Sequence, residues 1–386
     1  MATRPLEGLL VVDLTRAVAG PFCTMLLGDL GARVLKIEEP GSGDETRQWG
    51  PPFVEGESAY FLGLNRNKES VALNLKDERG RDVLRGLARR ADVLIENFRP
   101  GVAARLGIGP EELRARNPRL IYASVSGFGQ DGPDRLKPGY DLIVQAMSGL
   151  MKISAHPDGP PVKVGFPIAD ILASLHVGMG ILAALYERER TGVGRFLEVS
   201  LLEGLLASMC SATPSHLLTG SEPLAVGTAQ ANIVPYQMFA CQDQPIVCGA
   251  PNERIWRRFC QGLERPEWID DPRYRDNRAR NRHRAELVSE IEAVLRSRPC
   301  AEWIRRLEEH EVPCAPVQSV GQVLASAVVA ARGTVVEMEH ARLGKMKLVG
   351  NPVRLEGALL SYTPPPELGE HTAAVLRELL DIDPPE

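Results

Sequence analysis

Apolar, strand-like runs alternate with helix-like segments through the first third of this chain. The expected strands lie at residues 9–15, 32–40, 70–75, 91–98 and 119–129. The expected helices lie between them, at residues 22–31, 76–91 and 110–118. A chain in which strands and helices take turns folds into a parallel sheet with helices on its faces. The predicted fold class is therefore α/β.

A second, smaller domain is expected farther along the chain. With 386 residues, the chain exceeds the usual size of a single hydrophobic core. From about residue 222 loop-forming residues are frequent, and the strand-like segments IVPYQMFAC and QPIVCGA precede several short charged helices. This mixture predicts an α+β domain. The tail then returns to strand-like sequence and a final helix, AAVLRELLDI.

Composition and charge argue against two classes of binding partner, nucleic acids and membranes. A net charge of −5 lacks the basic surplus of nucleic-acid-binding proteins, so no nucleic-acid partner is expected. Charges or prolines interrupt each apolar stretch before the roughly 18 residues that a membrane span needs, so no membrane partner is expected. The N-terminal segment lacks a secretory cleavage pattern, and the seven cysteines form no C-x-x-C pair. Reduced thiols and a cytoplasmic location are expected.

The glycine motif Gly127-x-Gly129-x-x-Gly132 is the nearest approach to a cofactor signature. It follows a predicted strand, but an aspartate and a proline bracket its last glycine and no apolar helix begins there. The histidines are dispersed without the spacing of metal ligands, so no metal site is expected. We expect this motif to be a loop and the protein to hold no permanently bound cofactor.

Asp170 stands near the start of an apolar helix expected within residues 163–185, KVGFPIADILASLHVGMGILAAL. Pro167 suits a first helical turn because its missing N–H would be unpaired there. The positive end of the helix dipole is expected to keep the Asp170 carboxylate ionised, and an ionised carboxylate is a usable nucleophile. An aspartate in a first turn can also merely complement the dipole, so this segment alone leaves both interpretations open.

Several segments, taken in order, resemble one enzyme family. They are PLEGLLVVDLTRAVAGPFCTMLLGDLGARVLKIEEPGSGDETR, NRNKESVALNLK, ADVLIENFRPGVAARLG, PGYDLIVQAMSG, GPPVKVGFPIAD, ILAALYERERTGVGRFLEVSLLE and GEHTAAVL. The chain is similar, nearly end to end, to the class III coenzyme A-transferases of the CaiB/BaiF type. That resemblance implies an enzyme that moves coenzyme A (CoA) from an acyl-CoA to a free carboxylic acid, with both as substrates.

The same resemblance implies that Asp170 is the catalytic nucleophile. Its attack on the thioester would give a mixed anhydride, and the released CoA thiolate would return to form an aspartyl-CoA thioester. An incoming carboxylic acid would reverse these steps and leave as a new acyl-CoA. Covalent catalysis of this kind divides one difficult exchange into easier steps.

Positions that line the CoA site are also implied by the resemblance. Three segments, LNLK, ENF and ARLG, contribute Leu73, Lys76, Asn97, Phe98, Arg105 and Leu106. Lysine and arginine can pair with the phosphates of CoA, while phenylalanine and leucine offer apolar surface to its adenine. The positions expected to border the pantetheine and the thioester are Val18, Ala19, Lys137, Tyr140 and Asp141.

Departures from formyl-CoA transferase, a member of the family, bear on the acid substrate. Val18 stands where that enzyme has a glutamine beside the acyl group, and Glu39 replaces an arginine that helps to bind CoA. The run of glycines that covers its acyl intermediate is missing between residues 220 and 236. A short dicarboxylic acid such as succinate, glutarate or itaconate is therefore expected rather than a formyl/oxalyl pair.

Two alternative functions stay open. An α-methylacyl-CoA racemase on the same fold needs acid/base groups on both faces of the α-carbon. Racemases have G-H-D where this chain has Gly139-Tyr140-Asp141, and a tyrosine with an ordinary pKa of about 10 is a poor base at neutral pH, which favours transfer. A CoA-binding scaffold without activity is the other alternative, and the presence of Asp170 disfavours it.

An interlocked homodimer is a further implication of the resemblance, with each chain threading through its partner. The large domain is expected to be Rossmann-like, with its first part at residues 1–224 and a C-terminal segment at 331–386 that returns to it. The small α+β domain is expected at residues 225–330.

Overall fold

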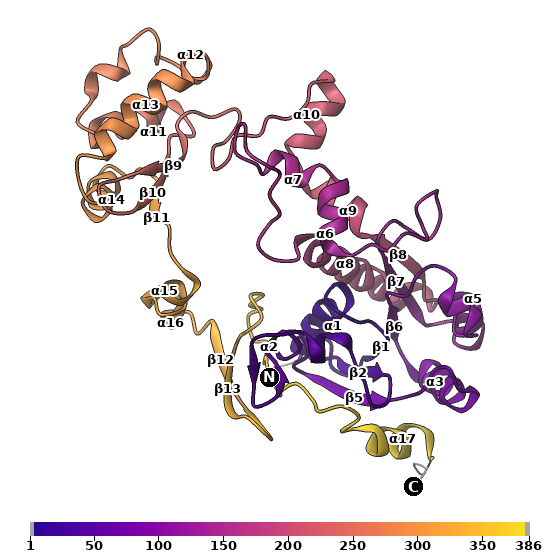
Figure 1. The fold of residues 1–386 in the computed structure, drawn as a ribbon. Helices are drawn as coiled ribbons and strands as arrows, with labels where there is room; N and C mark the ends of the chain where they lie inside the picture. Colours follow the sequence, from indigo (N-terminus) through magenta and orange to yellow (C-terminus); the bar gives the residue numbers. More distant parts are fainter. Residues whose placement is uncertain (1–3, 383–386) are drawn as a thin grey trace. The chain divides into compact units, whose positions relative to one another are not determined.

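The computed structural model describes residues 4–382, which form two compact units (Figure 1). Unit 1 combines the described residues of 1–150, 163–218 and 330–386, and unit 2 combines 151–162 with 219–329. Residues 151–162, which the sequence analysis places in the large domain, therefore belong to unit 2.

A six-stranded parallel sheet forms the centre of unit 1, with the order β5-β2-β1-β6-β7-β8. Its strands are β1 (Leu10–Asp13), β2 (Arg33–Glu38), β5 (Lys68–Ala72), β6 (Val93–Glu96), β7 (Ile121–Ser126) and β8 (Phe196–Ser200). The α/β prediction is confirmed, and all of these strands except β8 overlap runs predicted as strands. Strand β8 lies at the sheet edge and is only partly buried, so it lacks the continuous apolar run that marks the others.

Helices cover both faces of this sheet because neighbouring strand residues point in opposite directions. Val11 packs in the cluster that contains Cys23 of α1 (Ala19–Asp29) and Val177 of α8 (Ile168–Thr191). Val12 packs in a separate cluster with Leu84 of α3. The helices in contact with that second face are α3 (Glu78–Arg90), α5 (Pro110–Arg116) and α17 (Thr372–Leu380).

Shorter elements complete unit 1. Two hairpins consist of β3 (Phe53–Val54) with β4 (Glu57–Ser58) and β12 (Val335–His340) with β13 (Gly344–Val349). The short helices are η1 (Glu45–Gln48), α2 (Ala59–Leu62), α4 (Val102–Arg105), α6 (Asp141–Met147), α9 (Leu201–Ser208) and α10 (Ala212–Thr219). Helix α7 (Leu150–Ile153) begins at Leu150 and belongs otherwise to unit 2. Residues 209–211 interrupt the helical segment between α9 and α10.

Helix α8 is the one helix among residues 4–382 that is long and apolar enough to cross a membrane, judged by length and composition alone. The sequence expectation did not allow for such a helix. In the structure α8 packs along β7, β8, α1 and α9. Only 39% of its most apolar 18-residue stretch is buried within the chain. Core helices of soluble proteins meet the same criterion.

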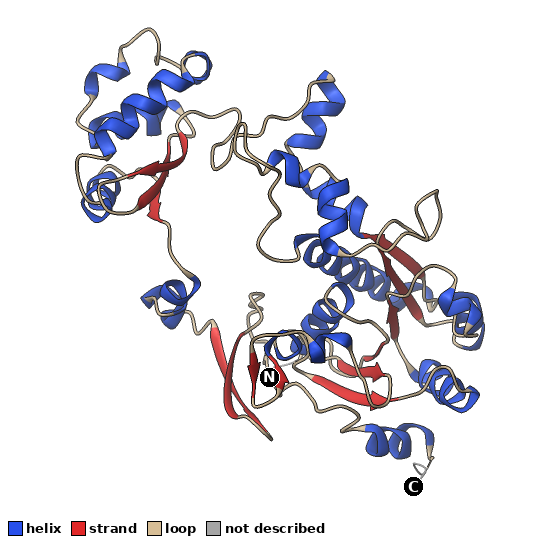
Figure 2. Cartoon of the chain, in the orientation of Figure 1, coloured by secondary structure: helices blue, strands red, loops and turns tan. Residues whose placement is uncertain are grey.

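Unit 2 contains a three-stranded antiparallel sheet surrounded by helices (Figure 2). Its strands run in the order β11 (Cys314–Pro316), β10 (Pro245–Gly249) and β9 (Tyr236–Ala240). Its helices include α11 (Glu253–Gly262), η2 (Pro266–Ile269), α12 (Asn277–Arg282), α13 (Arg284–Leu295) and α14 (Cys300–Glu309), with α15 (Val320–Leu324) and α16 (Ala327–Ala331) towards its end. Trp256, Phe259 and Trp303 are buried at the centre of its core.

Candidate active site

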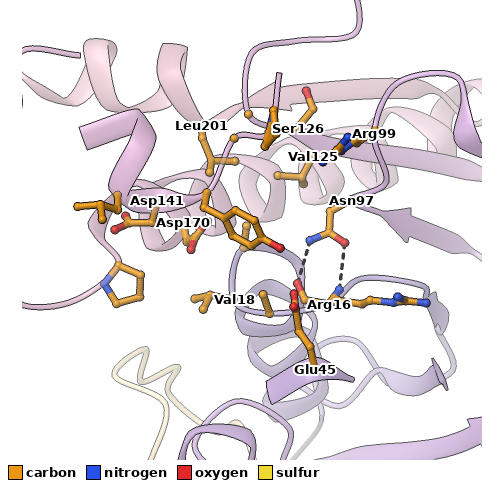
Figure 3. A pocket seen from close by; sticks show the side chains of 18 of the residues that line it. Arg16, Val18, Glu45, Asn97, Arg99, Val125, Ser126, Asp141, Asp170 and Leu201 are labelled. Atoms are coloured by element: carbon orange, nitrogen blue, oxygen red, sulfur yellow. Dashed lines mark hydrogen bonds between the residues drawn. The ribbon is translucent and has the colours of Figure 1, made fainter. Parts of the chain in front are cut away.

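The main pocket of unit 1 lies at the carboxyl ends of β1 and β6 (Figure 3). These strands are neighbours at the point where the strand order reverses direction, which is where open α/β sheets bind ligands. The pocket has a volume of about 860 Å³, the size of a small-molecule site. Asn97 joins the two strand ends, since its side chain accepts from the Arg16 amide at 3.0 Å and donates to the Arg16 carbonyl at 2.8 Å.

Asp170 lies on the pocket wall in the first turn of α8, as the sequence predicts, with Pro167 as the N-cap residue. The neighbouring Ala169 amide does not face a ligand, because it donates to Asp141 Oδ1 at 2.8 Å. Asp141 Oδ2 accepts from Gln145 at 2.7 Å, and Gln145 Oε1 accepts from the Val164 amide at 2.9 Å. Asp141 of α6 therefore caps α8 from outside the helix and brings a second carboxylate close to Asp170.

The electrostatic surroundings of Asp170 differ from the sequence expectation. Burial raises the pKa of Asp170 to about 7, and the charge of Asp141 raises it in the same direction. Burial and the Asp141 charge thus oppose the ionisation that the sequence analysis expects from the helix dipole. Near neutral pH this carboxyl group exchanges between its neutral and ionised forms.

A third ionisable group belongs to the same surroundings. Burial raises the pKa of Tyr60, with Asp170 and then Asp141 contributing to the increase, so the phenol stays neutral. The Tyr60 ring packs edge-on against Trp49 at 5.2 Å between centroids, and both side chains line the pocket.

The pocket brings together most of the residues predicted from the sequence. Those on its wall are Val18, Ala19, Asn97, Phe98, Lys137, Tyr140, Asp141 and Asp170. The loop that carries Lys137 and Tyr140 approaches the end of β7 closely, because a Cβ added to Gly127 would lie 2.5 Å from the Gly139 Cα. The Gly127 motif is accordingly a loop against a second backbone, as predicted.

Four predicted residues lie elsewhere. Among residues 4–382, the pocket lining does not include Leu73, Lys76, Arg105 or Leu106. Leu73 is buried in the core, Leu106 packs against that core, and Arg105 is exposed. The Lys76 side chain is 80% exposed and pairs with Glu39 at 2.6 Å, and Glu39 does line the pocket. Their contact with CoA stays a prediction.

Several pocket residues were not predicted. The basic ones are Arg16, Arg99, Arg135 and Lys163, and the others include Glu45, Gln48, Trp49, Tyr60 and Phe166. Arg16 and Arg99 each come directly after a predicted strand. Because the carboxyl ends of parallel strands meet at one edge of the sheet, both arginines could have been predicted as pocket residues. Trp49 and Tyr60 lie between the predicted strands at 32–40 and 70–75 and close to neither, and only the tertiary structure brings them to the site.

The arrangement is suited to an anionic ligand with a reactive carbonyl. The wall of one pocket carries basic side chains, the half-buried Asp170 carboxylate and apolar groups such as Val18 and Phe98. Within the described residues, no group of three or more His, Cys, Asp or Glu is placed to hold a metal ion.

Comparisons with known proteins agree with this geometry. The model of CoA-transferase family III matches residues 6–372. The chain is 43% identical to the succinyl-CoA:glutarate CoA-transferase of Mus musculus, over 98% of this chain and 87% of that protein. It is 42% identical to the acetyl-CoA:oxalate CoA-transferase of Acetobacter aceti, over 97% and 95%. A CaiB/BaiF family protein from Brucella suis has a similar crystal structure, with a TM-score of 0.87 and 36% identity over 98% of this chain and 100% of that chain.

The match runs through both units and includes the strand ends and the first turn of α8 that form the pocket. With this extent and identity, the resemblance seen in the sequence is confirmed: the chain belongs to CoA-transferase family III and is a CoA-transferase.

Proposed function

We propose that this enzyme transfers CoA from succinyl-CoA to a short dicarboxylic acid such as glutarate, through covalent intermediates on Asp170. The observation that carries the proposal is the Asp170 carboxylate on the wall of the pocket at the carboxyl ends of β1 and β6. The succinyl-CoA:glutarate CoA-transferase of Mus musculus, which is 43% identical, supports this choice of substrates.

The proposed reaction begins when ionised Asp170 attacks the thioester carbonyl. The C–S bond breaks, a mixed anhydride forms on Asp170, and the CoA thiolate leaves. The thiolate then attacks the aspartyl carbonyl, which releases the donor acid and leaves an aspartyl-CoA thioester. The acceptor carboxylate attacks that thioester to form a second anhydride, and CoA attacks its acyl carbon, which restores Asp170.

The raised pKa of Asp170 fits this role. A carboxylate that has lost solvation is a stronger base, and hence a stronger nucleophile, than one in water. Protonation below a pKa of about 7 removes the attacking electron pair, so the enzyme would lose activity in acid. Desolvation also protects the anhydride from water.

Basic side chains of the pocket can pair with the negative charges of CoA and of the acid substrate. CoA brings phosphates, and a dicarboxylic acid keeps one free carboxylate while the other reacts. The pocket offers Arg16, Arg99, Arg135, Lys137 and Lys163 for these groups, with Asn97 and Phe98 beside them.

A homodimer is the assembly we propose. One face of α8 exposes Leu175, Met179, Leu182 and Tyr186, with exposed fractions of 48, 65, 41 and 69%. The spacing of these residues places them on one stripe, and an apolar stripe of this kind favours burial against a second chain. The interlocked arrangement implied by the family resemblance is part of this proposal.

The substrate proposal is tested by a screen of acids. Purified enzyme is incubated with succinyl-CoA and one free acid at a time, and the new acyl-CoA is identified by mass spectrometry. Glutarate and other short dicarboxylic acids are expected to react fastest. A second series uses acetyl-CoA as the donor. If oxalate reacted with acetyl-CoA while glutarate did not react with succinyl-CoA, as the name of the Acetobacter aceti relative would suggest, the proposal of succinyl-CoA and glutarate as substrates would be wrong.

A further inference from the structure

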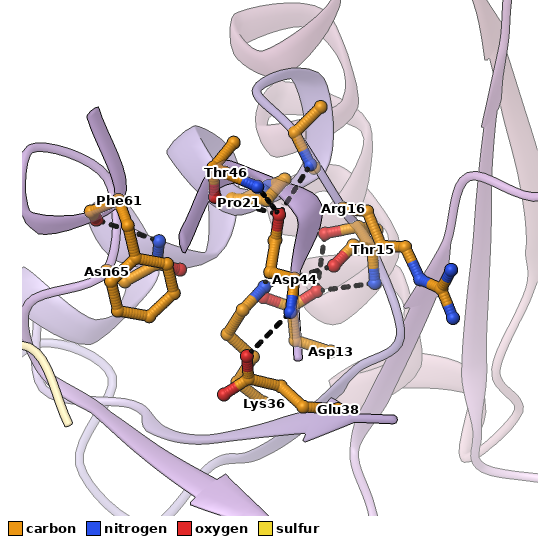
Figure 4. Close-up of polar contacts among 12 residues, drawn as sticks. Asp13, Thr15, Arg16, Pro21, Lys36, Glu38, Asp44, Thr46, Phe61 and Asn65 are labelled. Carbon is orange, nitrogen blue, oxygen red and sulfur yellow. Dashed lines mark hydrogen bonds and ion pairs between the residues drawn. The ribbon is translucent and has the colours of Figure 1, made fainter. Parts of the chain in front are cut away.

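A cluster of buried charges lies next to the pocket, and the proposed reaction does not use it (Figure 4). Asp13, Lys36, Asp44 and Lys68 are exposed by only 0, 0, 1 and 3%. Within the described chain, none of the four lines the pocket. Such charges are costly to bury unless each is paired and hydrogen-bonded, so their arrangement calls for a physical reason.

Two of these residues hold the backbone turn formed by residues 15–19, which we call the 15–19 turn. Lys36 Nζ pairs with Asp44 Oδ2 at 2.7 Å and donates to the Thr15 carbonyl at 3.1 Å. Asp44 Oδ1 accepts from the Ala17 amide at 3.3 Å. The ion pair is therefore hydrogen-bonded to the main chain of the turn at two points, the Thr15 carbonyl and the Ala17 amide.

The 15–19 turn forms the part of the pocket wall next to Asp170. Residues 16–19 all line the pocket, and Figure 3 shows Val18 near Asp170. The Ser174 hydroxyl lies 2.5 Å from the Ala19 carbonyl oxygen and 2.8 Å from the Asp170 carbonyl oxygen. A displacement of the turn would thus change the distance between Asp170 and a substrate that contacts Val18.

The turn needs external support because its own conformation is unfavourable. Ala17 has a φ of +62°, a left-handed conformation that costs a residue with a side chain about 1 kcal/mol or more. Helix α1 follows immediately, and within the described residues no side chain caps its first turn. A strained turn of this kind persists only where its surroundings fix it.

We propose that Lys36 and Asp44 are positioning residues for the transfer reaction, which set the 15–19 turn at the distance from Asp170 that acylation requires. The inference rests on the proposed function of Asp170. A contribution to stability alone does not account for the pair, because replacing a buried ion pair by apolar groups is often neutral. Through its hydrogen bonds to the turn, the pair instead fixes the position of the main chain at residues 15–17.

The test uses the full-length double variant Lys36→Met/Asp44→Asn, which removes both charges together and avoids a lone buried charge. Wild-type enzyme and variant are mixed with excess succinyl-CoA, the rate of the first CoA release is measured, and acylated Asp170 is identified by mass spectrometry. CoA affinity is measured separately by calorimetry. We expect acylation to slow by about 10- to 100-fold while the CoA dissociation constant changes less than about threefold.

A matched control exists elsewhere in unit 1. Arg66 and Asp29 form an equally buried pair, 3 and 1% exposed, at 2.6 Å, and Arg66 also donates to the Val349 carbonyl. The variant Arg66→Met/Asp29→Asn should keep the wild-type rate of acylation at a temperature where circular dichroism shows it folded. Equal slowing of both double variants would overturn the positioning role.

A milder variant covers the case in which the double variant does not fold. The Thr46 hydroxyl donates to Asp44 Oδ1 at 2.8 Å, and within the described residues Thr46 does not line the pocket. Thr46→Val loosens Asp44 and should slow acylation about 3- to 10-fold at unchanged CoA affinity. Wild-type acylation rates in the variants that fold would overturn the inference. Absence of an Asp170 adduct in the wild type would instead overturn the proposed function on which the inference rests.

Discussion

Asp141 Oδ1 accepts a hydrogen bond from the backbone amide of Ala169 at 2.8 Å, one residue before Asp170. The two carboxylates therefore meet at the same helix end, but only Asp141 receives that amide. Because like charges oppose each other's ionisation, this arrangement keeps the proton on Asp170 to higher pH.

Removal of the Asp170 carboxylate should abolish transfer. We expect Asp170→Ala to reduce the first-order rate of CoA release by more than about 1000-fold, because no other group would carry the acyl intermediate. The dissociation constant for CoA should stay near the wild-type value, as measured by calorimetry. Substantial turnover by the folded variant would remove Asp170 from the nucleophile role.

The reaction should depend on pH through Asp170. Because only the ionised form attacks, kcat/KM should rise with pH and level off above a midpoint near the Asp170 pKa of about 7. Asp141→Asn removes the like charge and should move this midpoint to lower pH. The pH profile of both enzymes checks this, and a midpoint that is unchanged or higher in Asp141→Asn would contradict the coupling.

Stability should respond to the same group with the opposite sign. The folded state raises the Asp170 pKa from 3.8 to about 7, so it holds a proton that the unfolded chain has lost, and the free energy of unfolding falls as pH rises through this window. Asp170→Asn should therefore be more stable than the wild type at pH 8, by about 1–2 kcal/mol after allowance for partial exposure. The difference should vanish below a pH of about 4. Denaturant unfolding at both pH values measures it.

Glu39 should weaken the binding of the CoA substrate. Its carboxylate lines the pocket and holds the Lys76 ammonium at 2.6 Å. Glu39→Gln removes a repulsive charge and frees Lys76 for a phosphate, so KM for succinyl-CoA should fall about two- to fivefold at low salt. Glu78→Gln removes the same charge from α3, outside the pocket, and should leave KM unchanged. An increase in KM for Glu39→Gln would contradict the prediction.

Helix α8 should carry part of a dimer interface. We expect the wild type to have twice the chain mass of 42.2 kDa in solution, as measured by light scattering. Met179 is 65% exposed in the single chain, and Met179→Glu places a charge on the apolar stripe, which should lower the yield of dimer when the unfolded protein is refolded. A monomeric wild type would refute the homodimer.

Much of the large unit could be predicted from the sequence because buried parallel strands are continuous apolar runs. LLVVDLT and ADVLIENF contain β1 and β6, and the pocket lies at the ends of these strands. Val18, Asn97 and Phe98, which the family resemblance implies for the CoA site, line that pocket, and their contact with CoA stays a prediction. Strand β8 was missed because an edge strand is exposed and its pattern is weak. Residues 151–162 belong to unit 2, although the sequence expectation groups them with the large domain, since no local pattern distinguishes them from its loops.

The α/β fold, the place of Asp170 in the first turn of a helix, and membership in the family can be predicted from the amino-acid sequence, because they follow from local patterns and from the order of segments. The chemical state of Asp170 cannot, because it is set by the folded surroundings. Its pKa depends on burial and on Asp141, which lies 29 residues away in the chain, and such effects act through space. The same holds for the 15–19 turn, which Lys36 and Asp44 support through contacts that no local pattern reveals.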